Sequence, residues 1–294
     1  MYWRLLLLFV GALAYDWKKY EGELKKEWER LLTRGYPETM VYDKGDFNTL
    51  ADVINPNGAH KNSILWESLV HAREWLAGAT LMNILDKMIT EYGTDEDVTR
   101  YLDNYDFHFI PVMNPDGYKH SWDDERMWRK NRRNNEGSLC FGVDLNRNYD
   151  NNWGAASEPE TQTVVDYVMG NTNPAWLVDV SMHTYGQYLL TPYGDCSLPP
   201  NWDTGLSDVV RLTCLAIEGT YNTRWDCGNS CEVLYASSGG SVDWMMATAG
   251  MPYTFVPELR GNGFDVSPSL IPLSFQEMWN GLVAMMNEIM SQNP

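Results

Sequence analysis

The residues whose types and spacing could do chemistry begin with His-Ala-Arg-Glu-Trp at 71–75. An apolar run at 64–66 precedes this segment, and a helical pattern begins near Leu76. A histidine at the end of a strand and a carboxylate three residues later, where a helix starts, can place two ligands on one metal ion. Two His and one Glu around a zinc with an open fourth position form a hydrolytic site. The pattern alone is weak, because most such pairs are neighbours on a helix surface.

His183 is the strongest candidate for a third ligand, because it follows the strand-like run 176–182. The chain has five histidines. His60 and His120 lie in polar sequence and are more simply solvent-exposed, whereas His108 lies inside an apolar run and is more simply a core residue. Asp144 is a candidate hydrogen-bond partner for one ligand imidazole.

Glu258 is the candidate for the base that such a site needs. This carboxylate follows the apolar run 253–256, with Pro257 between. A glutamate here is either a general base or one half of a buried ion pair with Arg260, and the residues leave both interpretations open.

A basic island, Trp-Arg-Lys-Asn-Arg-Arg at 128–133, stands in an acidic chain, and Arg147 adds another guanidinium. Elsewhere such a run would suggest nucleic-acid binding. The net charge of −18 argues against nucleic acid and against an anionic membrane surface as partners. Since a guanidinium binds a carboxylate through two parallel hydrogen bonds, arginines beside a metal indicate a substrate with a free carboxylate, such as a peptide C-terminus.

The composition and the N-terminus favour a secreted protein. The chain has 294 residues, of which 44% are hydrophobic. Residues 1–14 have the charged start, the apolar core and the small-residue end of a signal peptide. We therefore expect an extracellular chain that begins near Tyr15 and has no nucleic-acid or membrane partner.

Five cysteines in an oxidising compartment predict two disulfides and one free thiol, with the connectivity left open. They are Cys140, Cys196, Cys214, Cys227 and Cys231.

Strand-like and helical runs alternate along the chain. The strand-like runs are 40–42, 50–54, 64–66, 107–112, 176–182 and 253–256, and the helical runs are 17–32, 76–89, 159–169, 206–217, 242–249 and 275–289. Asn-Pro-Asp-Gly at 114–117 indicates a turn, and 121–153 and 227–240 indicate loops. The alternation predicts one α/β domain over 15–294, with a mixed, largely parallel twisted sheet and helices on both faces. Ligands bind such sheets at the carboxyl ends of the strands.

Six motifs, in order along the chain, resemble those of the zinc metallocarboxypeptidases of the carboxypeptidase A/B type. They are His-Ala-Arg-Glu-Trp at 71–75, Asn-Pro-Asp-Gly-Tyr at 114–118, Trp-Arg-Lys-Asn-Arg at 128–132, Val-Asp-Leu-Asn-Arg-Asn at 143–148, Tyr-Ala-Ser-Ser-Gly-Gly-Ser-Val-Asp-Trp at 235–244 and Glu-Leu-Arg at 258–260. The resemblance runs from about Tyr15 to Gln292. It implies the fold of that family and one Zn²⁺ per chain.

Carried over motif by motif, the resemblance implies that zinc is bound by His71, Glu74 and His183, with Asp144 orienting His71. Glu258 would be the general base that activates water. The substrate would meet a second group of residues: Arg132 at the scissile carbonyl and its oxyanion, Asn146, Arg147 and Tyr235 at the terminal carboxylate, and Arg73 and Arg129 along the approach.

The resemblance also implies a pocket for the C-terminal side chain. Its lining would include Ser181, Leu190, Gly194, Ser237, Val242 and Val256. Val242 stands where enzymes that cut after basic side chains carry an aspartate, which indicates an A-type preference for aliphatic or aromatic residues. We therefore expect a secreted, monomeric zinc-dependent exopeptidase that releases single C-terminal residues from peptides and proteins.

Three departures from the family pattern accompany these expectations. No inhibitory pro-domain is recognisable after Ala14, and Pro257 replaces the usual residue before the base. The segment between Asn148 and Ser157 is short and lacks the cysteine that would pair with Cys140. The absent pro-domain and the short segment favour an alternative, a catalytically impaired relative that acts as a zinc- or peptide-binding module.

Overall fold

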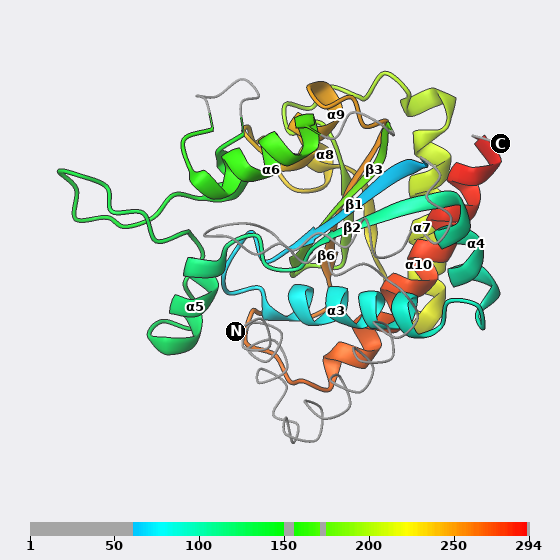
Figure 1. Cartoon of the computed structure of the whole chain (residues 1–294), viewed down its shortest axis with the longest axis horizontal. Coiled ribbons are helices and arrows are strands. Elements are labelled where there is room, and N and C mark those ends of the chain that lie inside the picture. The colour runs from blue at the N-terminus through cyan, green and yellow to red at the C-terminus, as the bar shows by residue number, and fades with distance from the viewer. Residues whose placement is uncertain (1–60, 150–155, 171–174, 293–294) are drawn as a thin grey trace.

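The computed structural model describes residues 61–149, 156–170 and 175–292 (Figure 1). The expected signal peptide and the runs predicted at 17–32, 40–42 and 50–54 lie outside them. The strands are β1 (Asn62–Ser68), β2 (Tyr105–Ile110), β3 (Trp176–Thr184), β4 (Tyr188–Thr191), β5 (Asp226–Asn229) and β6 (Tyr253–Leu259). The helices are α3 (Trp75–Thr90), α4 (Glu96–Asn104), α5 (Pro115–Asp123), α6 (Pro159–Gly170), α7 (Leu206–Tyr221), α8 (Ser230–Val233), α9 (Ser241–Ala247) and α10 (Leu270–Gln292), with 3-10 turns η1 (Leu145–Arg147) and η2 (Trp202–Thr204).

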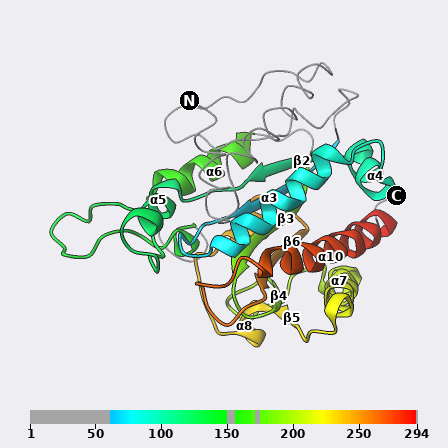
Figure 2. The same ribbon diagram turned by 90° about the horizontal axis from the view of Figure 1, so that it is seen from below.

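The six strands form one sheet in the order β2-β1-β3-β6-β4-β5. The pairs β2·β1, β1·β3, β3·β6 and β4·β5 are parallel, and only β4·β6 is antiparallel within this sheet. Helices cover both faces: α3, α7 and α10 lie on one side of the sheet and α6 and α9 on the other (Figures 1 and 2). The predicted mixed, largely parallel sheet with helices on both faces is confirmed.

Alternation along the central strands explains the two layers. In β1 the side chains of Ile64 and Trp66 join the larger core under α3 and α10, whereas Leu65 joins the core under α6 and α9. Both faces are apolar at this end of the strand, which is typical of a parallel strand covered on both sides. This burial fixes the pairing register, because a slip of one residue would exchange the two faces.

Three local predictions need correction. Residues 114–117 do not form an isolated turn but begin α5, where the Asn114 side chain accepts a hydrogen bond from the Gly117 amide at 2.9 Å and Pro115 occupies the first turn. The segment 227–240, expected as loop, contains most of β5 and all of α8. The helix α4 and the strand β4 were not predicted.

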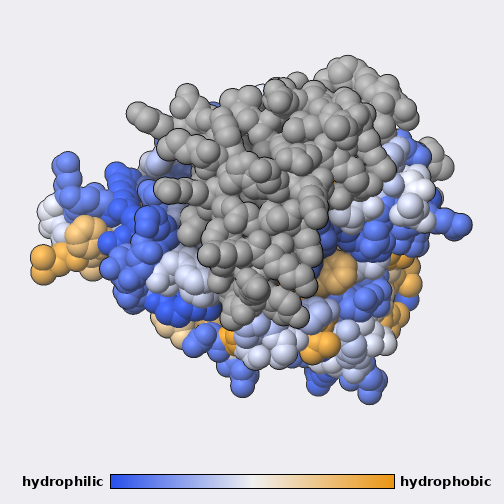
Figure 3. All heavy atoms as spheres, turned by 60° about the horizontal axis from the view of Figure 1, so that its bottom comes forward, coloured by the Kyte–Doolittle hydropathy of each residue, from blue (hydrophilic) through white to orange (hydrophobic). Residues whose placement is uncertain are grey.

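The cysteines behave as the composition predicts. Disulfides join Cys196 to Cys231 and Cys214 to Cys227, and Cys140 is free and exposed. Cys140 lies in the protruding segment between α5 and η1, whose end carries apolar surface (Figure 3).

Across the described ranges, no helix is both long and apolar enough to span a bilayer.

His108 is the core histidine that the sequence predicts. It is 5% exposed on β2, its Nε2 lies 3.1 Å from the Ser63 hydroxyl, and its Nδ1 contacts the Tyr167 hydroxyl. Burial lowers the pKa of His108 to about 4. The folded protein therefore holds this imidazole neutral at pH values where the unfolded chain would protonate it.

This burial predicts a specific loss of stability in mild acid. Below the ordinary histidine pKa of 6.5 the unfolded state binds the additional proton, so the free energy of unfolding should fall as the pH drops, and level off near pH 4. The contribution of His108 to this loss is about 3 kcal/mol. Urea unfolding of the wild type and of His108→Gln across this pH range should show a shallower dependence in the variant. Parallel curves would contradict the assignment.

Candidate active site

Three adjacent strands deliver the candidate catalytic residues to one edge of the sheet. His71 follows the end of β1, His183 lies near the end of β3, and Glu258 lies near the end of β6. His183 and Glu258 are paired positions of β3 and β6, so their side chains lie on the same face. A tight turn in which the Glu74 amide donates to the His71 carbonyl at 3.2 Å brings Glu74 back beside His71 before α3 begins.

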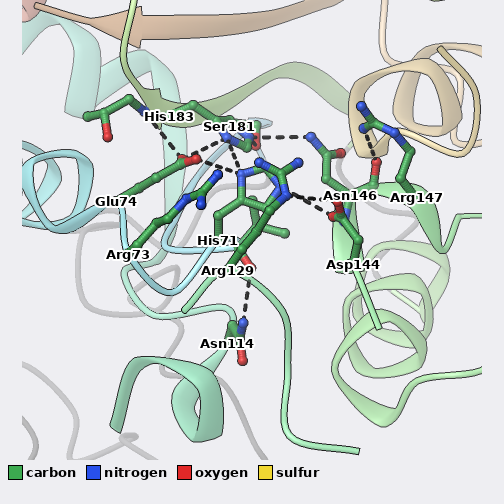
Figure 4. A network of polar contacts seen from close by, with 12 residues as sticks. His71, Arg73, Glu74, Asn114, Arg129, Asp144, Asn146, Arg147, Ser181 and His183 are labelled. Carbon is green, nitrogen blue, oxygen red and sulfur yellow. Dashed lines mark hydrogen bonds and ion pairs between the residues drawn. The ribbon is translucent and has the colours of Figure 1, made fainter. Parts of the chain in front are cut away.

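His71, Glu74 and His183 form a compact buried group (Figure 4). His71 Nδ1 lies 2.7 Å from Glu74 Oε1, His183 Nδ1 lies 2.9 Å from Glu74 Oε2, and the two Nδ1 atoms are 3.1 Å apart. The three side chains are at most 4% exposed. Within the described ranges no other three His, Cys, Asp or Glu residues gather so closely. Two imidazole nitrogens and a carboxylate around one point are the donor set of catalytic zinc, so these residues fit the ion.

Electrostatic interactions within this group oppose the effect of burial on Glu74 and His71. Burial alone would raise the pKa of Glu74, but the His71 and His183 rings outweigh it and hold that pKa well below its usual range. Burial also lowers the pKa of His71, but the Glu74 and Asp144 carboxylates together more than reverse this effect, so the pKa of His71 is raised.

Asp144 lies at the outer nitrogen of His71, where the predicted orienting role would place it. His71 Nε2 lies 3.3 Å from Asp144 Oδ1, and Arg129 Nε donates to Asp144 Oδ2 at 2.9 Å. Burial opposes ionisation of Asp144, but His71 and Arg129 together keep its pKa far below the usual range. A carboxylate on the second nitrogen fixes the ring orientation of a metal-ligating histidine.

The Glu258 side chain lies on the side of His183 and the other candidate metal ligands, and it is not paired with Arg260. Arg260 instead makes a two-pronged ion pair with Glu277, at 2.9 and 2.7 Å. Desolvation raises the pKa of Glu258 to about 7, although the neighbouring His183 lowers it. Pro257 does not change the pairing register of β3 and β6, because Val180 pairs with Phe255 in the same register as His183 pairs with Glu258.

The predicted carboxylate-binding residues gather on and around η1. Arg147 lies beside Tyr235, with 3.4 Å between the guanidinium Nη2 and the phenol oxygen, and the Asn146 amide oxygen accepts from the Ser241 amide at 2.9 Å. At Gly239 (φ +74°) an added Cβ would lie 2.7 Å from the Arg147 carbonyl oxygen, so only glycine permits this packing.

Three of the residues predicted to line the specificity pocket are apolar and pack together. Leu190, Val242 and Val256 form a separate buried cluster, with Tyr188 and Val233 packed against it. The carboxylate of Asp243, next in sequence, is bonded to the backbone: its Oδ2 accepts a hydrogen bond from the Gly194 amide at 3.0 Å.

Comparison with known proteins identifies the family of this chain. The model of the zinc carboxypeptidase family matches residues 44–281. The chain belongs to the zinc carboxypeptidase family. Membership places it among the metallocarboxypeptidases, which are peptide hydrolases.

Several relatives show how far the similarity extends. Carboxypeptidase O of Bos taurus is 30% identical over 94% of this chain and 77% of its own length, and carboxypeptidase A2 of Mus musculus is 33% identical over 79% of this chain. The chain spans 60% of the length of that A2 enzyme. The crystal structure of carboxypeptidase A from Helicoverpa armigera has a TM-score of 0.73 at 31% identity, covering 80% of this chain and 63% of that one.

In this zinc carboxypeptidase Arg129, and not Arg132, makes the ion pair with Asp144, the residue beside His71. The Arg132 guanidinium lies over the Trp128 ring, 4.4 Å from its centroid, and 5.5 Å from the Phe141 centroid. Arg73 lies over the Phe264 ring at 3.9 Å. The oxyanion role of Arg132 stays a prediction.

The sequence interpretation missed one residue beside this family's metal site, Glu67, and missed the direct contact of Ser181 with His183. The Ser181 hydroxyl lies 3.3 Å from His183 Nε2, and Glu67 pairs with Ser181 across β1 and β3. The signal for Ser181 was its spacing of two residues from His183, which places both side chains on one strand face.

The Asp144 contact predicts a loss of metal affinity on removal of its charge. Asp144→Asn should raise the zinc dissociation constant by about 10- to 100-fold, because His71 loses its anionic acceptor and Arg129 its ion pair. Competition with a chromophoric chelator would measure the constant. Asp203→Asn, at an exposed position of η2, is a matched control and should leave zinc affinity unchanged. Equal affinities in both variants would contradict the role of Asp144.

Proposed function

We propose that this chain is a secreted, monomeric zinc carboxypeptidase that releases single aliphatic or aromatic residues from the C-termini of peptides and proteins. One observation carries the proposal: His71, Glu74 and His183 face one point while Glu258 lies beside His183 on the adjoining strand. Such a site has metal ligands and a separate carboxylate that is free to move a proton. The disulfides and the family membership support an extracellular location.

Glu258 is the proton carrier in this proposal. Zinc, when held by His71, Glu74 and His183, supplies Lewis acidity and lowers the pKa of a water. Glu258 takes a proton from the attacking water and returns it to the departing amine. A pKa near 7 suits both steps, because the same group must accept and then donate near neutral pH.

Substrate position comes from the groups around η1. The Arg147 guanidinium and the Tyr235 hydroxyl lie together and can bind the terminal carboxylate, with Asn146 beside them. Fixing that carboxylate places the last peptide bond at the metal and makes the attack effectively intramolecular. It also excludes internal peptide bonds, which have no free carboxylate to bind.

Removal of the base should lower activity strongly without loss of zinc. Glu258→Gln keeps the size of the side chain but cannot accept the proton, so kcat/KM should fall by about 100- to 10,000-fold. Cleavage of a blocked dipeptide ending in Phe and zinc content per molecule would be measured together. Full activity in the variant would refute the assignment. Zinc-loaded wild type that cleaves no dipeptide ending in Phe, Leu, Arg or Glu would favour the alternative of a zinc- or peptide-binding module.

The apolar pocket predicts the order of substrates. The wild type should cleave dipeptides ending in Phe or Leu faster than those ending in Arg, because Val242 is 7% exposed among apolar neighbours and offers no charge. Val242→Asp should lower kcat/KM for Phe by about 10- to 200-fold and shift the ratio toward Arg. Val242→Asn is the matched control for polarity without charge, and should lower Phe cleavage without favouring Arg. A wild type that prefers Arg would overturn the pocket assignment.

A further inference from the structure

The imidazoles of His71 and His183 differ in the group that can accept a hydrogen bond from their second nitrogen, Nε2. Each ring turns Nδ1 toward the metal group, so Nε2 carries the ring proton and must donate it. His71 Nε2 meets the Asp144 carboxylate at 3.3 Å. His183 Nε2 has two polar neighbours, Ser181 Oγ at 3.3 Å and Asn146 Nδ2 at 3.5 Å.

Donor and acceptor roles exclude Asn146 as the acceptor. Its amide oxygen accepts from the Ser241 backbone N–H at 2.9 Å, and this bond fixes the orientation of the amide. The Nδ2 group that faces His183 is therefore a donor, and two donors cannot bond each other. Of these two neighbours, the Ser181 hydroxyl is the one that can accept from His183.

A serine that accepts from a ring N–H has its own proton left to donate. Ser181 is fully buried on β3, and Glu67 is its pairing partner on β1. The Glu67 carboxyl is also fully buried, and the hydroxyls of Ser181 and Ser241 are the hydrogen-bonding groups beside it. The contact of the Ser181 hydroxyl with the Glu67 carboxyl is looser than its contact with His183. Neither Glu67 oxygen has a complete hydrogen bond within the described residues. A buried carboxyl group with free acceptor capacity can accept the hydrogen bond that the Ser181 hydroxyl has left to donate.

We propose that Glu67 and Ser181 are positioning residues that orient His183 through a carboxyl–hydroxyl–imidazole chain, as Asp144 orients His71 directly. The inference rests on the proposed function, because zinc is the ion that His183 would bind. Both histidines would then be oriented by carboxyl groups: His71 directly by Asp144, and His183 by Glu67 through the Ser181 hydroxyl.

The test is a double-mutant cycle read out as zinc affinity. Ser181→Ala and Glu67→Gln should each raise the zinc dissociation constant by about 10-fold. If Glu67 acts through Ser181, then Glu67→Gln added to Ser181→Ala should cause less than about a 2-fold further change. Chelator competition gives the constants, and circular dichroism of the zinc-free variants checks that each is folded.

Ser241→Ala is a matched control for this cycle. Ser241 is also fully buried beside Glu67, but among the described residues it makes no hydrogen bond to His183, and alanine keeps the backbone N–H that Asn146 needs. Zinc affinity should therefore stay within about 2-fold of the wild type. The visible spectrum of the Co²⁺-substituted protein gives a second readout, and should change in Ser181→Ala and Glu67→Gln but not in Ser241→Ala.

Two results would overturn the proposal. One is an unchanged zinc affinity in Ser181→Ala. The other is a Glu67→Gln effect of equal size with and without Ser181, which would show that Glu67 acts on His183 through its field alone. Failure of the proposed function is a separate outcome: zinc-loaded wild type would cleave no peptide, whatever the affinities in the cycle.

Discussion

The structure depends on parallel pairing among β1, β3 and β6, which places three strand ends side by side. Because side chains alternate across a sheet, a slip of one residue in β6 would turn Glu258 from the metal group into the core. The apolar face beneath α3 and α10 prevents that slip, since Val180 and Phe255 are fully buried there. The packing of one face of the sheet therefore fixes the chemistry of the other.

Burial and charge are balanced within the site. Glu74 is buried at 2% exposure, which would be costly for a lone carboxylate, and two imidazoles compensate it. At Glu258 the attraction of His183 and Arg129 does not outweigh burial, so desolvation raises its pKa to about 7. Two glutamates of the candidate site thus differ: the pKa of Glu74 is held well below its usual range, and that of Glu258 is raised to about 7. Environment alone makes this difference.

The sequence predicted the residues whose position follows from strand ends. His71, His183 and Glu258 each follow or end an apolar run, so their meeting at one edge could be predicted from the run pattern. The direction of Arg132 could not, because it lies in a segment without periodicity and its stacking on Trp128 depends on how that segment folds back. Glu67 was missed for another reason. It looks like any polar residue in a strand, and only the register of β1 against β3 reveals that it lies opposite Ser181.

Short elements escaped prediction for a related reason. The strand β4 has only four residues, too few to show alternation, and its pairing with both β5 and β6 comes from distant sequence. The helix α4 is nine residues long and carries few apolar positions, although Asp95 caps its first turn with two hydrogen bonds. Asn-Pro-Asp-Gly at 114–117 has the residues of a turn and equally those of a helix start, and the chain after it decides between the two.

The Asn148 side chain has a consequence for how this region can vary. Its amide oxygen accepts from the backbone N–H groups of Ser157 and Glu158, both at 3.1 Å, and its amide nitrogen donates to the Ser157 hydroxyl at 2.9 Å. One side chain thus ties the exit of η1 to the start of α6. A connection of another length between those two points would leave these three hydrogen bonds in place, provided that Asn148, Ser157 and the Glu158 backbone keep their positions.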